Sequence, residues 1–202
     1  SYFFMRGEWA EQAKIMQHAI DEAYENGIFG SQGLMNGASS FAVECTLHRG
    51  AGAYICGEET ALLEAVEGKR GWPRIKPPFP AVSGLFGRPT IINNVETLAA
   101  VTQIVERGAA WWQSLGCKSS IGGPASYGVK LMGVSGHVNN PDVFEVELGI
   151  PLRKLVDEYA GGMRDGRKFK GAIAGGVSMG VLGPDQFDAE MDFDIGPKYS
   201  VM

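Results

Sequence analysis

The segment that most constrains the fold is a glycine-rich stretch between an expected strand and an expected helix. Residues 41–47 alternate apolar and polar side chains, which is typical of a half-buried strand. Glycines follow at positions 50, 52 and 57, and the apolar run 61–66 is predicted to be a helix that Gly68 ends. Strand, glycine loop and helix in this order predict an α/β fold whose loop backbone makes tight turns or approaches a ligand closely.

The glycine loop departs from the common phosphate-binding motifs. The dinucleotide fingerprint G-x-G-x-x-G fails because Ile55 stands where its third glycine belongs. Gly52 and Gly57 have the spacing of a P-loop, but Glu58 and Glu59 replace the lysine and the hydroxyl residue that should follow. Two carboxylates at this point would repel a triphosphate, which disfavours an ATPase or a GTPase.

Glu58, Glu59 and Tyr54 each allow two interpretations. Carboxylates at the start of a helix are stabilised by the helix dipole by about 0.3–1 kcal/mol each, which would explain Glu58 and Glu59 as structural residues. They are equally suited to accept hydrogen bonds from ribose hydroxyls or an amide of a ligand. Tyr54 would either stack on a flat ring bound at the loop or pack in the core.

Polar residues in the proline-rich stretch 69–90 and after it also have two interpretations. Basic side chains beside an acidic loop would suit a ligand with ribose and phosphate groups, but a solvated loop explains them as well; they are Arg70, Arg74, Lys76 and Arg88. Asn93 and Glu96 have capping-box spacing before a helix that ends at Gly108. Asn93 and Asn94 are also able to bind a flavin or its ribityl chain.

The rest of the sequence predicts two domains that differ in their order of helices and strands. The first, residues 1–115, begins with a strand at Tyr2–Met5 and a helix over 8–26, followed by a surface loop at 30–40. Residues 116–126 are rich in glycine and serine and are interpreted as an exposed linker. The second domain, residues 127–192, is expected to be a small α+β module. Its predicted elements are strands at 129–134 and 143–148, a helix with Pro151 at its first position, and a strand with a turn over 171–176.

Composition excludes several classes of protein. The net charge of −5 disfavours nucleic-acid binding, and no run approaches the roughly 18 apolar residues of a membrane helix. The cysteines Cys45, Cys56 and Cys117 form no C-x-x-C pair, so neither metal ligands nor a complete iron–sulfur site are predicted. Their sparse number suits a reducing compartment. No catalytic triad is readable around the three histidines.

Three ordered strings of sequence carry a specific resemblance. They are Gly50–Leu63 with its core Tyr-Ile-Cys-Gly-Glu-Glu-Thr, Pro73–Pro80, and Gly87–Leu98 with its Asn-Asn pair. They resemble the NADH-binding flavoprotein subunit of respiratory complex I, the 51 kDa type. Its relatives are the diaphorase subunits of NAD-reducing hydrogenases and formate dehydrogenases. The resemblance extends over nearly the whole chain, because residues 134–141 and 149–153 are similar to the β-grasp, soluble-ligand-binding module of that family.

The resemblance implies a fold, a chemistry and a set of site residues. The first domain is expected to be part of a Rossmann-like FMN-binding domain, and the second a β-grasp domain. The implied chemistry is hydride transfer from NADH to FMN, followed by single electrons leaving to iron–sulfur clusters, with no side chain acting as an acid or base. The positions that match FMN- and NADH-contacting residues of the family are Tyr54, Gly57, Glu58, Glu59, Lys76, Asn93, Asn94 and Thr97.

The resemblance also implies partners and a location, and it shows departures. The family works beside a thioredoxin-like [2Fe–2S] subunit in a multi-subunit complex that is cytoplasmic, or on the matrix side in mitochondria, at the periphery of the inner membrane. The family has an upstream glycine segment that cradles the FMN phosphate and a downstream cysteine cluster for a [4Fe–4S] centre, and neither is found in this sequence. The chain is therefore expected to be a central fragment that binds FMN weakly and is inactive when isolated. A diaphorase subunit and a non-catalytic scaffold or binding module are the alternatives.

Overall fold

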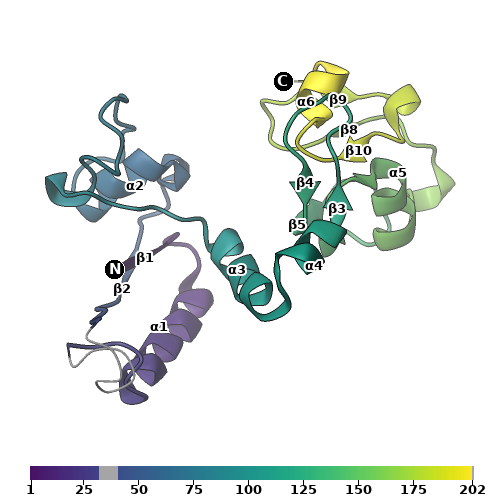
Figure 1. Ribbon diagram of the computed structural model, residues 1–202. Helices are drawn as coiled ribbons and strands as arrows, with labels where there is room; N and C mark the ends of the chain where they lie inside the picture. The colour runs from purple at the N-terminus through teal and green to yellow at the C-terminus, as the bar shows by residue number, and fades with distance from the viewer. Residues whose placement is uncertain (32–40, 202) are drawn as a thin grey trace. The chain divides into compact units, whose positions relative to one another are not determined.

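The computed structural model describes residues 1–31 and 41–201, and these form two compact units, Ser1–Asn94 and Val95–Met202 (Figure 1). Most of the loop predicted at 30–40 lies outside the described residues. Each unit mixes helices and short strands, so the α/β character of the chain is confirmed in this general form. Within the described residues, no helix is long and apolar enough to cross a membrane.

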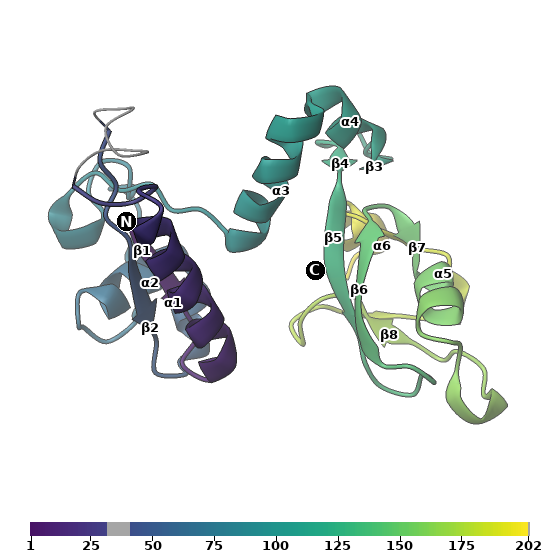
Figure 2. The same cartoon turned by 90° about the horizontal axis from the view of Figure 1, so that it is seen from below.

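The first unit opens with a strand–helix–strand arrangement. Strand β1 (Tyr2–Met5) and strand β2 (Thr46–Arg49) pair in parallel, with Tyr2 opposite Thr46 and Met5 opposite Arg49. Helix α1 (Ala10–Glu25) lies beside them and buries Ala13 and Ile20 (Figures 1 and 2). The prediction of β1 and α1 is confirmed to within two residues at each end.

The strand predicted at 41–47 is wrong in position. Regular pairing begins only at Thr46, and Val43 forms an isolated bridge with Gly30. The Tyr24 hydroxyl accepts a hydrogen bond from the Cys45 amide at 2.9 Å and donates one to Glu44 at 2.7 Å. Strand β1 pairs only with Thr46–Arg49, so the residues before Thr46 are not part of the ladder.

The glycine loop and the helix after it follow the predicted order. A short 3₁₀ helix at Tyr54–Gly57 leads into helix α2 (Glu59–Val66), and Gly68 ends it with a φ of 77°, a left-handed conformation suited to glycine. Residues 69–94 are irregular except for a 3₁₀ turn at Leu85–Gly87. The Arg74 side chain fixes this long segment, because it donates to Glu64 at 2.6 Å, to Glu67 at 2.7 Å and to the Gly84 carbonyl at 2.9 Å.

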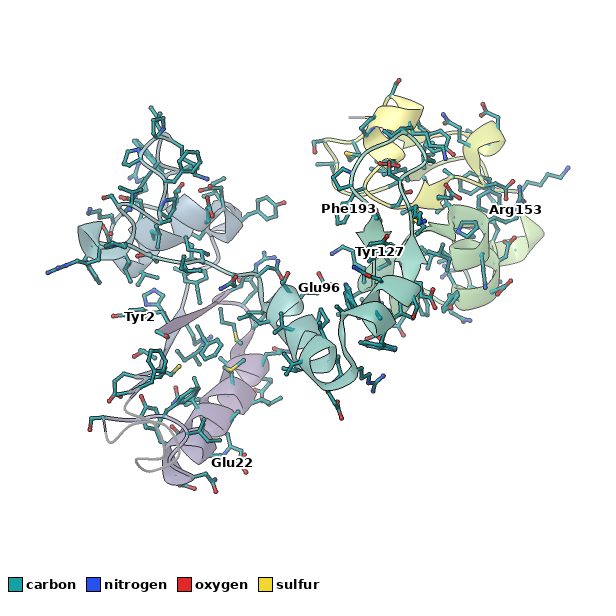
Figure 3. All side chains as sticks on the ribbon, viewed as in Figure 1. Tyr2, Glu22, Glu96, Tyr127, Arg153 and Phe193 are labelled. Carbon is teal, nitrogen blue, oxygen red and sulfur yellow. The ribbon has the colours of Figure 1, made fainter. Side chains whose placement is uncertain are left out.

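The second unit begins with two helices and a strand pair. Helix α3 (Val95–Arg107) and helix α4 (Ala109–Ser114) are separated by Gly108, the predicted end of the first helix. The Glu96 carboxylate accepts hydrogen bonds from the Lys130 ammonium at 2.8 Å and the Leu131 amide at 3.1 Å (Figure 3). This ion pair, chiefly the Lys130 hydrogen bond, lowers the pKa of Glu96.

The segment 116–126 is more ordered than a linker. Strands β3 (Gly116–Cys117) and β4 (Ser126–Tyr127) pair antiparallel and close it into a loop. Inside the loop, the Ser119 hydroxyl and the Ser120 amide both donate to the buried Asp194 carboxylate at 2.8 Å. Interpreting the whole segment as an exposed linker is therefore wrong, because only Lys118 and residues 120–124 are exposed.

A long hairpin dominates the rest of the second unit (Figure 2). Strands β5 (Val129–Val134) and β6 (Asp142–Glu147) pair antiparallel over their full length, as predicted to within one residue. Helix α5 (Leu152–Lys154) continues as a π-helical turn at Leu155–Tyr159. Pro151 does not begin this helix; it is extended and belongs to strand β7 (Ile150–Pro151).

Short elements complete this unit around one core. Strand β7 pairs with β10 (Glu190–Met191), and β8 (Ala172–Ile173) pairs with β9 (Val181–Leu182). A 3₁₀ turn at Arg164–Gly166 precedes β8, and a second at Pro184–Gln186 lies between β9 and β10. Helix α6 (Ile195–Tyr199) follows β10. The main buried residues of the core are Val138, Leu152, Val156, Ala160, Ala174, Leu182, Phe187, Ala189, Ile195 and Val201.

Candidate functional site

The N-terminus of α2 gathers the acidic residues of the candidate site. Glu58 precedes the first helical residue and caps the helix, because its Oε2 atom accepts hydrogen bonds from the amides of Thr60 at 2.8 Å and Ala61 at 2.9 Å. These are two of the amides that a helix N-terminus leaves without an internal partner. The capping interpretation of Glu58 is therefore confirmed, whereas its contact with a ligand stays a prediction.

Glu58 is held in its ionised form by its donors. Partial burial raises the pKa of this carboxyl, but the hydrogen bonds from the Thr60 hydroxyl and from the Ala61 and Thr60 amides outweigh it, helped by the charge of Lys76. The net result is a pKa below the ordinary value for glutamate. The helix start consequently keeps a fixed negative charge at neutral pH.

Glu59 and Lys76 face each other beside this cap. The Lys76 ammonium forms an ion pair with the Glu59 carboxylate, and its Nζ atom lies 3.6 Å from Oε1 of Glu58. The hydrogen bond to Glu59 is the main cause of the raised pKa of Lys76. The Glu59 side chain is 40% exposed, so its carboxylate remains accessible from solvent. The structure thus brings together three of the predicted residues from two separate segments.

Tyr54 and Gly57 lie on the exposed loop just before the cap. Tyr54 is 85% exposed, which contradicts the alternative that it packs in the core. Gly57 is exposed too, and a Cβ atom built on it would meet nothing within 4 Å. An exposed aromatic ring, an open glycine edge, carboxylate acceptors and an ammonium donor fit a flat, hydroxyl-bearing and phosphate-bearing ligand such as a flavin or nicotinamide nucleotide.

The remaining predicted residues fall on both sides of the division between the units. Asn93 and Asn94 are exposed at the end of the first unit. Because α3 begins at Val95, Asn94 rather than Asn93 directly precedes the helix. Thr97 is exposed on α3, in the second unit. Their contact with a cofactor stays a prediction.

The basic residues of the proline-rich segment have separate roles. Arg74 belongs to a cluster of ion pairs with Glu64 and Glu67 along a hollow of about 560 Å³. The Lys69 ammonium, Arg74 and the Phe86 amide outweigh the effect of burial and lower the pKa of Glu67 to about 2. These charges are satisfied by one another, so Arg74 is structural and Lys76 is the cation directed at the acidic loop.

Sequence reasoning missed Thr60, which connects the two segments of the site. Its hydroxyl donates to Glu58 at 2.5 Å and accepts the Arg74 amide at 2.8 Å. A threonine after two glutamates carries no signal of its own in a single sequence. Among the described residues, no group of three His, Cys, Asp or Glu side chains is arranged to hold a metal ion.

The fold and this loop belong to a known class of flavoprotein domain. Residues 1–103 match the model of the Nuo51 FMN-binding domain, and residues 131–182 match that of the SLBB domain. The chain belongs to the Nuo51 FMN-binding family, which confirms the resemblance drawn from the sequence. The boundaries predicted at 1–115 and 127–192 stay a prediction.

The curated proteins that are similar to this chain carry the names of NADH-oxidising proteins. One NADH-quinone oxidoreductase subunit of Rhizobium meliloti is 51% identical over 194 residues, which are 96% of this chain and 44% of the relative. NADH dehydrogenase [ubiquinone] flavoprotein 1, mitochondrial, of Dictyostelium discoideum is 48% identical over 196 residues, 96% of this chain and 39% of the relative. The chain therefore spans less than half the length of these curated relatives.

A solved structure agrees with this assignment. The crystal structure of NAD⁺-reducing [NiFe]-hydrogenase in the H₂-reduced state matches 96% of this chain and 30% of the hydrogenase chain, with a TM-score of 0.78 and 35% sequence identity. At this identity the match supports common descent as well as a common fold.

Proposed function

We propose that this chain forms part of the FMN- and NADH-binding portion of an NADH-oxidising flavoprotein subunit of the NADH:quinone oxidoreductase type. The observation that carries the proposal is the match of residues 1–103 to the Nuo51 FMN-binding domain. The partly exposed pair of Glu59 and Lys76 beside an open glycine loop supports it, because its groups complement those of a dinucleotide. In this proposal the first domain is a portion of a Rossmann-like fold, and residues 127–192 form a β-grasp domain.

The residues of the site bind and orient; none of them is required as an acid or a base. FMN, when bound, accepts the hydride of NADH and releases single electrons to iron–sulfur clusters. Glu58 holds the helix start, Glu59 accepts hydrogen bonds from ribose hydroxyls, and Lys76 attracts the negative charge of the dinucleotide. Tyr54 offers its exposed ring for stacking. Gly57, Asn93, Asn94 and Thr97 contact the cofactor in this proposal.

The proposal includes partners and a location. The names of the relatives place them in NADH dehydrogenases built from several subunits, and a neighbouring thioredoxin-like [2Fe–2S] subunit is the acceptor that we propose for the electrons. The complex would lie at the periphery of the inner membrane, on the cytoplasmic side in a bacterium or the matrix side in a mitochondrion. A diaphorase subunit is the second candidate, supported by the hydrogenase structure at 35% identity.

Flavin analysis of the full-length protein tests this function. The purified protein should release FMN on denaturation, and NADH should bleach the bound flavin under anaerobic conditions. Absence of flavin after incubation with FMN, or a bound flavin that NADH does not bleach, would favour a non-catalytic module. Co-purification with a quinone-reducing or a hydrogenase complex separates the two catalytic candidates.

A further inference from the structure

Thr60 uses both hydrogen-bonding functions of its hydroxyl inside the protein. The residue is 1% exposed, its hydroxyl donates to Oε2 of Glu58 at 2.5 Å, and the same oxygen accepts the amide of Arg74 at 2.8 Å. One oxygen atom therefore joins the acidic helix start to the segment that carries Lys76. Thr60 and Arg74 are 14 residues apart in the sequence.

The connection has a direct geometric consequence for Lys76. Arg74 is held through its side chain by Glu64 and Glu67 and through its amide by Thr60. Lys76 follows two residues later, and its ammonium forms ion pairs with Glu58 and Glu59. The hydroxyl of Thr60 thus holds the backbone two residues before Lys76.

Loss of the Thr60 hydroxyl should change the distance between Lys76 and the two carboxylates more than it changes helix α2. Glu58 would keep its hydrogen bonds from the Thr60 and Ala61 amides, so the cap of α2 survives. The Arg74 amide, in contrast, would lose its acceptor, and a partly buried donor without a partner is costly enough to shift the backbone at residues 74–76, while the Arg74 side chain keeps its ion pairs. Lys76 would move with it.

We infer that Thr60 is a positioning residue for dinucleotide binding, acting through Lys76. This inference rests on the proposed function and deepens it, because it assigns to a buried residue the spacing between the cation and the carboxylates that meet the ligand. Thr60 itself touches neither NADH nor FMN.

Valine and serine at position 60 separate the hydroxyl from the shape of the side chain. In the full-length protein, Thr60→Val should raise the KM for NADH roughly five- to tenfold, as expected for one lost hydrogen bond. The kcat with ferricyanide and the FMN content should stay the same, and Thr60→Ser should stay within about twofold of the wild type because it keeps the hydroxyl. Thr102→Val, which removes an exposed hydroxyl on α3, is the matched control and should change nothing.

Two further measurements distinguish positioning from a general loss of stability. In a Lys76→Met background, Thr60→Val should add little to the KM, because residues that act through one another are not additive. Hydrogen exchange of the amides of residues 74–76, measured without ligand, should be about tenfold faster in Thr60→Val and unchanged in α1. Thr60→Ala gives the same comparison if the valine variant does not fold.

The results of these experiments distinguish a failure of the proposed function from a failure of the role inferred for Thr60. A wild-type protein that neither binds FMN nor oxidises NADH would overturn the proposed function and this inference with it. With an active wild type, the inference alone is overturned if Thr60→Ser is as impaired as Thr60→Val. It is also overturned if the valine effect is undiminished by Lys76→Met, or if exchange at residues 74–76 is unchanged.

Discussion

The carboxylate of Asp194 accepts a hydrogen bond from the hydroxyl of Ser119 at 2.8 Å, across 75 residues of sequence. Asp194 is 4% exposed, and the Ser119 hydroxyl, with the Ser120 amide, lowers its pKa against the opposing effect of burial. The contact fixes one side of the loop between β3 and β4 and leaves residues 120–124 at its exposed tip.

Limited proteolysis should therefore cut this chain first at residues 120–124, and Asp194→Ala should accelerate the cut roughly five- to tenfold because one anchor of the loop is lost. Mass spectrometry of the fragments identifies the site. Asp188→Ala, which removes an exposed ion pair with Arg153, is the control and should leave the rate unchanged. Early cleavage within residues 127–190 would contradict this prediction.

Glu58 and Glu59 should differ in their effect on stability. Glu58→Ala removes the side-chain cap of α2 and should lower the free energy of unfolding by about 0.5–2 kcal/mol. Glu59→Ala removes a charge near the helix start and a partly exposed ion pair with Lys76, and should cost less than about 1 kcal/mol. Urea unfolding of both variants measures the difference, and an equal loss in the two would argue against the observed cap.

Glu59→Gln should change NADH binding more than it changes folding. Losing a charge-assisted hydrogen bond costs about 1.5–3 kcal/mol, which corresponds to a rise in KM of roughly 10- to 150-fold. The KM for NADH and the melting temperature are measured together in the full-length protein. Glu22→Gln, on the exposed side of α1 (Figure 3), is the control. An unchanged KM with a large drop in melting temperature would make Glu59 a structural residue.

Glu67 should make the stability of the chain depend on acid pH. Its side chain is 5% exposed, and its pKa is lowered from 4.5 to about 2, with the Lys69 hydrogen bond as the main cause. The stabilisation by the ionised carboxylate is therefore complete above pH 4.5 and is lost as the pH falls toward 2.

The difference in unfolding free energy between the wild type and Glu67→Gln isolates this contribution. It should be about 1–3 kcal/mol at pH 6 and should shrink as the pH falls below 4.5. The matched variant Glu11→Gln breaks an exposed ion pair with Lys14 and should change the unfolding free energy only slightly at pH 6. A Glu67→Gln difference that is constant from pH 6 to pH 2 would refute the assignment.

Periodic elements could be predicted from the sequence, because their pattern is local. The hairpin of β5 and β6 and the helix α1 follow alternating and helical spacing closely. The strand predicted at 41–47 begins only at Thr46, because β1 pairs with Thr46–Arg49 alone and the pattern of a strand does not show where its partner lies. The linker interpretation of 116–126 failed for the same kind of reason, since Asp194 lies far along the chain.

The grouping of three residues of the candidate site agrees with the sequence prediction, but their separate roles could not be predicted. The resemblance identified Glu58, Glu59 and Lys76, and the structure places them together. Only the hydrogen bonds show that Glu58 caps the helix while Glu59 remains accessible, because glutamate is not among the residues preferred as a cap. Thr60 was not found because its connection to Arg74 is a tertiary contact.

In the proposed function, the ion pair between Lys76 and Glu59 would make ligand binding an exchange of counterions. The ammonium is already neutralised inside the protein, so an arriving phosphate gains only the difference between its own attraction and that of the carboxylate it displaces. The released carboxylate then needs a new donor, which a ribose hydroxyl on the same ligand would supply. A simple anion would replace the carboxylate at Lys76 but would supply no hydroxyl donor to Glu59. The pair would therefore select molecules that carry a phosphate and a hydroxyl group at the right separation.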